Sequence, residues 1–223
     1  MVFRDRCHAG LCLANELNAY RSDPTAVVLA LPRGGVVVGY EISRALHLPL
    51  DVFITRKLST PDNPEYAIGA VSETGALYLN PEAVEVFHLS HDDLEGLIEV
   101  QRQEIARRQA LYRQGRPVRA LTDRTVILVD DGIATGSTFF ATIEAVTELS
   151  PRRLVAAIPV GPYETLARVK SLADELVVLE VPDGFSAVGN AYQDFTQVED
   201  AQVVVLLKAA QDEFYRQSCP SPP

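Results

Sequence analysis

The chain has 223 residues, of which 47% are hydrophobic, and its formal net charge at pH 7 is −10. This length and apolar content suffice for one sizeable α/β domain, and the acidic balance argues against a nucleic-acid-binding surface over the whole protein. No apolar run approaches the length of a membrane span, the first residues lack the features of a signal peptide, and the three irregularly spaced cysteines fit reduced thiols, so we expect a cytoplasmic protein.

The first predicted elements are a helix and a strand–loop–helix unit. Residues 4–20 have the apolar spacing of an amphipathic helix, which Asp23 and Pro24 end. The unbroken apolar run 26–31 predicts a strand buried on both faces, and 36–46 predicts a helix. Between them, Arg33, Gly34 and Gly35 offer one cation and several bare backbone amides, which suits a pyrophosphate group. A tight turn with a surface arginine is the alternative.

The next segment predicts a strand over 50–55, followed by the two cations Arg56 and Lys57. Residues 58–66 contain two prolines, an asparagine and two acids, a composition typical of a flexible loop. The segments 67–72 and 76–79 flank a short polar turn and predict a β-hairpin.

Residues 81–119 are predicted to form a helical insertion. Ser90 has the character of a helix N-cap, with Asp92 and Asp93 in the first turn and a long apolar stripe after them. Between residues 102 and 124 there are seven arginines and only two acids, the one basic island in an acidic protein. Two interpretations stay open: a solvated helix face, or a docking surface for a phosphate-bearing partner.

The most informative stretch is 125–138, which reads TVILVDDGIATGST. Its apolar run predicts another buried strand, which the adjacent acids Asp130 and Asp131 follow directly. The glycines and hydroxyl residues that lead into a helix-period segment are Gly132, Thr135, Gly136, Ser137 and Thr138. A helix N-terminus holds phosphate through unpaired N–H groups, whereas carboxylates accept hydrogen bonds from paired hydroxyls or lie near a divalent cation. The order therefore indicates a cradle for a sugar phosphate, although an Asp-Asp-Gly sequence alone is often only a turn.

The carboxyl-terminal part predicts strands over 154–158 and 176–181 around a helix over 163–173. A segment rich in turn residues, 182–195, follows the last strand and includes Phe185. A buried core phenylalanine is the alternative to a functional role for it. A final helix is predicted over 198–214, and residues 218–223 are expected to be a disordered tail.

The stretch 126–138 resembles the phosphoribosyl pyrophosphate (PRPP) motif of type I phosphoribosyltransferases, which combines a hydrophobic strand, two acids, a short spacer, Thr-Gly and small hydroxyl residues. Segment 182–195 resembles the hood of the 6-oxopurine members, which carries Pro-Asp, an aromatic residue, Val-Gly and an Asp-aromatic pair. The resemblance implies an α/β fold with three layers and a mostly parallel sheet. Residues 1–217 would form one domain, with 81–119 as an insertion and 182–195 as the hood.

The resemblance implies transfer of ribose 5-phosphate from PRPP to a nitrogenous base, with release of pyrophosphate and with Mg²⁺ as cofactor. By this resemblance the 5′-phosphate site comprises Gly132, Ala134, Thr135, Gly136, Ser137 and Thr138. Pyrophosphate would bind Arg33, Gly34 and Gly35. The catalytic residues would be Asp130, Asp131, Arg56 and Lys57, and the two acids would also hold Mg²⁺, directly or indirectly. Phe185 would stack on the base.

The same resemblance implies that loop 58–66 closes over the site and that the peptide bond between Pro32 and Arg33 is cis. The expected partners are PRPP and a small base, with no membrane and no nucleic acid, and a homodimer is possible under this family. A non-catalytic PRPP or nucleotide-binding regulator and a phosphoribosyl hydrolase are the alternatives to a transferase. Because the 6-oxopurine enzymes carry an acid where this chain has Ala134, and a lysine near Val160-Gly161, we expect poor turnover of hypoxanthine and guanine.

Overall fold

The computed structural model describes residues 2–60, 63–116 and 119–218. A five-stranded parallel sheet lies at its centre, in the order β2-β1-β6-β7-β8. The strands are β1 (Ala26–Ala30), β2 (Leu50–Val52), β6 (Thr125–Val129), β7 (Arg153–Val160) and β8 (Glu175–Glu180). The predicted α/β class with a mostly parallel sheet is confirmed.

Strands β1 and β6 are neighbouring inner strands of this sheet, and every residue of both is buried. They pair in register from Ala26 opposite Thr125 to Ala30 opposite Val129, so that they end together. A strand covered on both faces needs apolar side chains at every position, which is why both segments have unbroken apolar runs. The loops that follow β1 and β6 therefore meet at one edge of the sheet.

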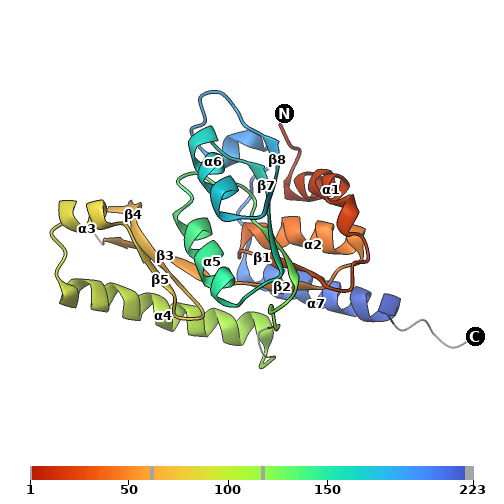
Figure 1. Cartoon of the computed structure of the whole chain (residues 1–223), viewed down its shortest axis with the longest axis horizontal. Helices are drawn as coiled ribbons and strands as arrows, with labels where there is room; N and C mark the ends of the chain where they lie inside the picture. The colour runs from red at the N-terminus through yellow and green to blue at the C-terminus, as the bar shows by residue number, and fades with distance from the viewer. Residues whose placement is uncertain (1, 61–62, 117–118, 219–223) are drawn as a thin grey trace, which may run out of the picture.

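Helices cover both faces of the sheet (Figure 1). On one face, α1 (Arg6–Glu16) and α2 (Gly34–Leu46) bury side chains such as Leu13 and Ile42 against Ile127 of β6. On the other, α5 (Ser137–Glu148) and α6 (Tyr163–Leu172) pack Phe139 and other apolar residues against Leu128. Helix α7 (Asp200–Ser218) lies beside α2. The three layers follow from the alternation of strands and helices in the sequence.

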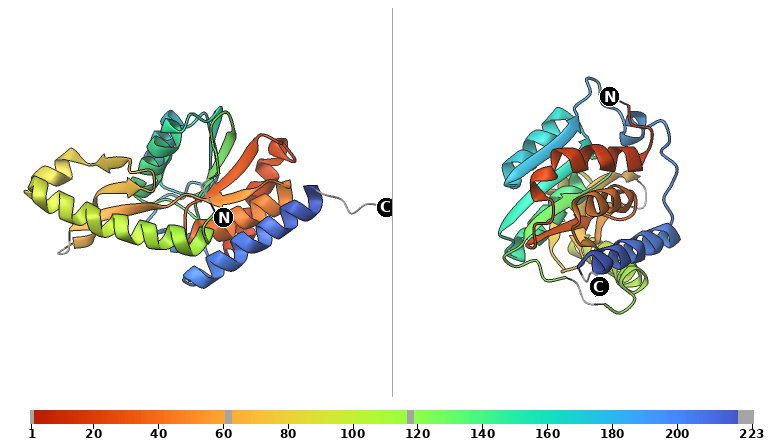
Figure 2. Two further views of the ribbon diagram at one scale, coloured as in Figure 1. Left: turned by 90° about the horizontal axis from the view of Figure 1, so that it is seen from below. Right: turned by 90° about the vertical axis from the view of Figure 1, so that its right-hand side faces the viewer.

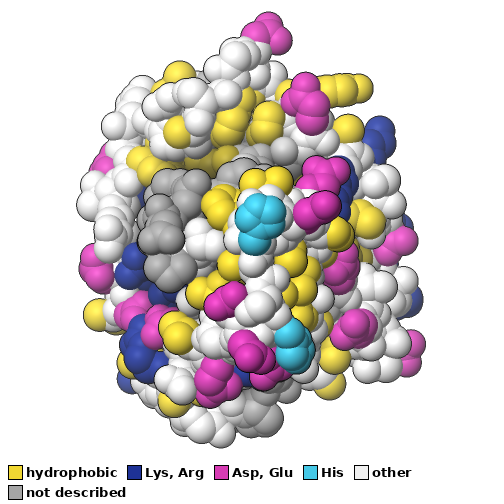
Figure 3. Space-filling view, turned by 90° about the vertical axis from the view of Figure 1, so that its left-hand side faces the viewer, with side chains coloured by type: hydrophobic (Ala, Val, Ile, Leu, Met, Phe, Trp, Pro, Cys, Tyr) yellow, Lys and Arg dark blue, Asp and Glu magenta, His cyan; other side chains and the backbone are white. Residues whose placement is uncertain are grey.

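An extension projects from one side of these layers (Figures 1 and 2). It contains the antiparallel strands β3 (Thr55–Thr60), β4 (Asn63–Ser72) and β5 (Leu77–Leu79), with α3 (Pro81–Val86) and α4 (His91–Arg113). Ser90 caps α4 and forms a capping box with Asp93, as the sequence predicts. At the end of the extension, hydrophobic side chains are exposed beside acids and histidines (Figure 3). Val86 of α3, the helix at this end, is an exposed apolar residue.

Two sequence predictions for 50–66 are wrong. The single strand expected over 50–55 is two strands, because Phe53 N still donates to Ala30 O of β1, whereas Ile54 O accepts from Glu73 N beside the hairpin. The flexible loop expected over 58–66 is largely strand: β3 continues to Thr60 and β4 begins at Asn63, with residues 61–62 outside the described part. Register shifts at Leu58–Thr60 show how a pairing accommodates this irregular composition.

Other boundaries differ by a few residues. The first helix is α1 with a 3₁₀ turn at Asn18–Tyr20, and the segment 81–119 holds two helices, α3 and α4, where one long stripe was expected. The last helix reaches Ser218, so this residue is not part of a tail; residues 219–223 lie outside the described part. Within the described residues, no helix combines the length and the apolar character needed to cross a membrane.

Candidate active site

The loops after β1 and β6 meet at the carboxyl edge of the sheet, and two glycines allow their contact. Helix α2 begins at Gly34, and a Cβ atom there would lie 1.8 Å from Oδ2 of Asp131. A Cβ on Gly35 would lie 2.9 Å from the carbonyl oxygen of Val129. Any larger residue would push the start of α2 away from the acids. The bond between Pro32 and Arg33 is cis, as predicted.

The two acids that follow β6 have different surroundings. Arg6 of α1 donates its Nε–H to Oδ2 of Asp131 at 2.6 Å, in an ion pair whose side chains are only 11% and 15% exposed. Asp130 accepts a hydrogen bond from the backbone N–H of Asp131 at 2.8 Å. Burial raises the pKa of Asp130 well above its usual value, and the negative charge of Asp131 raises it further. Asp131 therefore has a cationic partner in Arg6, whereas burial and the charge of Asp131 disfavour the charged form of Asp130.

Arg6 is itself fixed by the segment around the hood. Its Nη1 donates to the carbonyl oxygen of Thr196 at 2.8 Å, and its guanidinium lies 3.8 Å above the ring of Phe195. Tyr192 donates its hydroxyl hydrogen to the carbonyl oxygen of Asp131 and stacks on Phe195, with the ring centroids 5.0 Å apart. The chain near residue 195 thus helps to position the acid loop, through Arg6 and Tyr192.

The loop from Gly132 to Gly136 ends at an uncapped helix. Gly136 has a φ of 78°, in the left-handed region, and precedes α5 without a side chain that caps the first turn. Ala134 and Thr135 are exposed, and the hydroxyls of Thr135 and Ser137 lie 3.4 Å apart. Thr165 of α6 donates to the carbonyl oxygen of Ala134 at 2.8 Å and holds the loop in place. The first amides of α5 and the adjacent hydroxyls are thus available to an anion.

A cluster of arginines lies near the start of α2. Arg56 of β3 donates to Oε1 of Gln101 of α4 at 3.1 Å. Burial lowers the pKa of Arg56, and the positive charges of Arg108 and Arg33 lower it further. Arg33 faces Glu199 across 3.7 Å at the protein surface. Arg33 before α2, Arg56 of β3 and Arg108 of α4 thus repel one another, although Glu199 pairs with Arg33 and Glu104 pairs with Arg108 at 2.7 Å. A bound anion would reduce the repulsion that remains.

The sequence suggested that Arg56 and Lys57 follow a strand of the parallel sheet. They lie instead within β3 of the extension. Successive residues of a strand face opposite sides, so these two side chains cannot share one site surface. Because the chain crosses from one sheet to the other at Ile54, Arg56 reaches the site from the extension. The structure brings Arg56 to Arg33, and it places Lys57 on the other face of β3.

The predicted hood passes beside the acid loop. A Cβ on Gly132 would lie 2.5 Å from Cγ1 of Val188, so Val188 packs directly on this glycine. Phe185 is half-buried and lines a cavity of about 250 Å³ with Val160 and Asn190. Val160 is also within 3.0 Å of the Cβ position of Gly132, so this cavity adjoins the acid loop.

Arg6 and Tyr192 are functional candidates that the sequence analysis missed. Arg6 lies 125 positions before its partner Asp131, inside a predicted helix with an ordinary polar face. Tyr192 lies within the hood segment 182–195, two residues before the Asp-aromatic pair, with no spacing that links it to the acids. No local signal distinguishes either residue, because each role depends on a contact between distant segments.

Comparisons with known proteins agree with this geometry. The family model of the phosphoribosyl transferase domain matches residues 12–193. Relatives from two strains of Mycobacterium tuberculosis, provisionally named phosphoribosyl transferases, are 42% identical over 213 residues, which is 96% of this chain and 48% of theirs. The chain thus spans about half the length of these relatives. The crystal structure of TT1426 from Thermus thermophilus is similar with a TM-score of 0.78 and 45% identity, covering 93% of this chain and 98% of that one. The chain belongs to the phosphoribosyl transferase domain family.

Proposed function

We propose that this chain binds PRPP at the carboxyl edge of its sheet and transfers ribose 5-phosphate to a nitrogenous base. The observation that carries this proposal is the convergence of three features at one edge. These are the glycine start of α2, the acids after β6 and the uncapped start of α5. A phosphate, a pair of sugar hydroxyls and a pyrophosphate can be held there together.

Each part of PRPP has a proposed partner. The 5′-phosphate binds the amides and hydroxyls from Thr135 to Thr138, together with the backbone of Gly132 and Ala134. Asp130 and Asp131 accept hydrogen bonds from the two ribose hydroxyls. Pyrophosphate binds the amides of Gly34 and Gly35 and the guanidinium groups of Arg33 and Arg56, which supply the positive charge that the leaving group requires. Lys57 faces the other side of β3 and is the weakest of the proposed catalytic residues.

The residues present fit an Mg²⁺ ion that arrives with PRPP. Asp131 already has a cationic partner in Arg6, so Asp130 is the carboxylate that remains for a metal or its bound water. Among the described residues, no group of three or more His, Cys, Asp or Glu side chains gathers around one point. Asp130 would hold the ion together with PRPP, directly or through bound water. When bound, Mg²⁺ would neutralise negative charge on the pyrophosphate.

The proposed reaction is a substitution at C1 of the ribose. The bond between C1 and the pyrophosphate oxygen breaks, and pyrophosphate leaves with the electron pair. A ring nitrogen of the base forms the new bond to C1, and its proton passes to water. The transition state resembles an oxocarbenium ion, so the protein acts by positioning the reactants and stabilising the leaving group. Phe185, at the cavity next to Gly132, is the proposed stacking surface for the base.

Several further features belong to this proposal. We propose that 81–119 is an insertion and that 182–195 acts as the hood over the base. We also propose that residues 58–60 of β3 and 63–66 of β4 close over bound PRPP. A cytoplasmic location and a homodimer are also predictions; gel filtration with light scattering would test the dimer. A regulator without catalysis and a phosphoribosyl hydrolase are the other functions to distinguish.

Incubation of the protein with PRPP, Mg²⁺ and a panel of purine and pyrimidine bases tests the proposal, with pyrophosphate release as the readout. A transferase releases pyrophosphate only with its base, whereas a hydrolase releases a phosphoribosyl product with water alone. A regulator binds PRPP in calorimetry and releases nothing.

Substitution of the acid pair, beside a matched control, tests the proposed contacts with PRPP. The double variant Asp130→Asn and Asp131→Asn should lose at least about tenfold in PRPP affinity, since each lost charge-assisted hydrogen bond is significant. The double variant Asp92→Asn and Asp212→Asn removes the same charge from helix positions outside the site and should bind PRPP normally. Equal affinity in both double variants would remove the central claim.

A further inference from the structure

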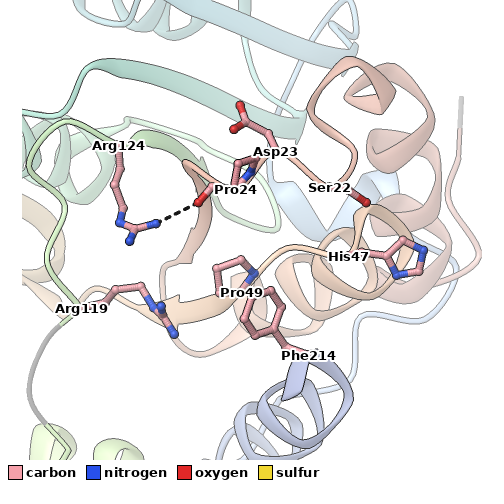
Figure 4. A pocket seen from close by; sticks show the side chains of 8 residues that line it. All are labelled: Ser22, Asp23, Pro24, His47, Pro49, Arg119, Arg124 and Phe214. Atoms are coloured by element: carbon pink, nitrogen blue, oxygen red, sulfur yellow. Dashed lines mark hydrogen bonds between the residues drawn. The ribbon is translucent and has the colours of Figure 1, made fainter. Parts of the chain in front are cut away.

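A second cavity lies at the opposite edge of the sheet, where the parallel strands begin. Its volume is about 670 Å³, within the range of small-molecule sites. The loops before β1 and β2, Arg119 and Arg124 before β6, and Phe214 of α7 form its walls (Figure 4). The carboxyl ends of these strands carry the candidate active site, so the cavity is separate from it.

Two arginines give this cavity its charge. Arg119 and Arg124 both line it and both are half-buried (Figure 4). In the described part of the chain, the two guanidinium groups make one hydrogen bond, a long one of 3.4 Å from Arg124 to the carbonyl oxygen of Pro24. Among the residues that the structure describes, no acid forms an ion pair with Arg119 or Arg124.

The nearby carboxylates are committed to other groups. Asp23 lines the cavity, but it accepts hydrogen bonds from the amide and hydroxyl of Thr25 at 2.8 and 2.7 Å, and it lies 4.0 Å from Arg152. Asp51 accepts from the backbone amides of Val52 and Arg119. Asp23 is the one carboxylate among the described lining residues, against two guanidinium groups that form no ion pair with a described acid. This excess of positive charge favours an anion, and the planar fork of each guanidinium suits phosphate oxygens.

The other walls of the cavity indicate which chemical group could bind beside a phosphate. The ring of Phe214 and the ring of Pro49 line the same cavity, so a flat ring can pack there while a phosphate contacts the arginines. We propose that this cavity is a second site for a nucleotide, with its phosphate on Arg119 and Arg124 and its base near Phe214. The proposal also accounts for part of the basic island between residues 102 and 124.

Titration of the full chain with AMP, followed by amide chemical shifts in NMR spectra, tests the proposal. Shifts at Ser22 and His47 report the new site, and shifts at Asp131 and Ser137 report the active site. The double variant Arg119→Gln and Arg124→Gln should weaken AMP binding at Ser22 and His47 by at least about tenfold. The double variant Arg102→Gln and Arg216→Gln, which removes two exposed arginines elsewhere, should leave it unchanged.

A second variant keeps both charges and tests the ring. Phe214→Leu should weaken binding of AMP while inorganic phosphate binds as before. Phosphate binding as tight as that of AMP would overturn the assignment to a nucleotide. An unchanged AMP response in the arginine double variant, or no response at Ser22 and His47, would overturn the site.

Substitution of Asp130 and Asp131 distinguishes failure of this proposal from failure of the proposed function. In the double variant Asp130→Asn and Asp131→Asn, the AMP response at Ser22 and His47 should persist. Loss of PRPP binding at the carboxyl edge therefore leaves the second site intact, and absence of the second site does not affect PRPP binding.

Discussion

At the scale of single residues, the charged form of Asp130 destabilises the folded protein. Its folded-state pKa is raised from 3.8, first by burial and then by Asp131, so the native state disfavours its charged form. The contribution of Asp130 to the free energy of unfolding is therefore fully present below its unfolded-state pKa. It is lost as the pH rises through its folded-state pKa. Natural proteins tolerate such penalties mainly where function needs the group.

Replacing Asp130 by Asn should make the protein more stable at about pH 8, by on the order of 1 kcal/mol, because the amide is never charged. The gain should shrink as the pH falls toward the ordinary aspartate value, where the wild-type carboxyl is already neutral. Denaturant unfolding of both proteins across this pH range measures the effect. A constant difference at every pH would show that desolvation of Asp130 is not its source.

Gly34 and Gly96 differ in the space available for a side chain. A Cβ on Gly34 collides with Asp131 and also comes within 2.8 Å of Nε of Arg6, whereas a Cβ on Gly96 of α4 meets nothing within 4 Å. Gly34→Ala should therefore disrupt the ion pair and weaken PRPP binding at least about tenfold. Gly96→Ala should leave binding intact and stabilise the helix by about 0.4–1 kcal/mol. Calorimetry with PRPP and thermal unfolding of both variants test this pair.

At the scale of elements, one buried arginine attaches α4 to the β-hairpin. Arg113 is only 4% exposed, and it pairs in a bidentate manner with Glu73, at 2.5 and 2.7 Å. It also donates to the carbonyl oxygen of Val52 at 2.7 Å. The interpretation of the basic island as a solvated helix face is therefore wrong for Arg113, and also for Arg108, whose side chain is 11% exposed.

Removing one partner of this pair should lower the free energy of unfolding, because a buried charge remains without its counter-ion. We expect Arg113→Ala to lower the free energy of unfolding by about 3–5 kcal/mol. Arg102→Ala, on the exposed side of the same helix, should change it by less than about 0.5 kcal/mol. The double variant Arg113→Met and Glu73→Leu should recover much of the loss. Denaturant titrations measure all three, and a small effect of Arg113→Ala would contradict the role assigned to the pair.

At the scale of the whole molecule, the identity of the acceptor depends on features from several loops. The exposed Ala134 cannot exchange a proton with a purine ring, and neither Val160 nor Gly161 offers a side-chain donor to a 6-oxo group. We expect kcat/KM for hypoxanthine and guanine below about 10⁴ M⁻¹s⁻¹, in contrast to an efficient enzyme. Steady-state assays with both bases, beside adenine and pyrimidines, decide the point. Efficient hypoxanthine turnover would show that other residues supply these functions.

The sequence alone was sufficient for the fold class and for most strands of the parallel sheet. Strands covered on both faces need continuous apolar runs, and such runs are local patterns. The position of the acid loop was also predictable, because the acids directly follow a strand and a helix begins a few residues later. Capping of α4 by Ser90 is local in the same way.

Contacts between distant segments were decided only by the tertiary structure. The pairing of Arg6 with Asp131, the entry of Arg56 from the extension and the burial of Arg113 each join residues far apart in the chain. Local spacing does not specify such contacts, because they depend on how whole elements pack. The same packing brings Arg119 and Arg124 to one cavity at the amino edge, whereas the sequence shows them only as members of a basic island.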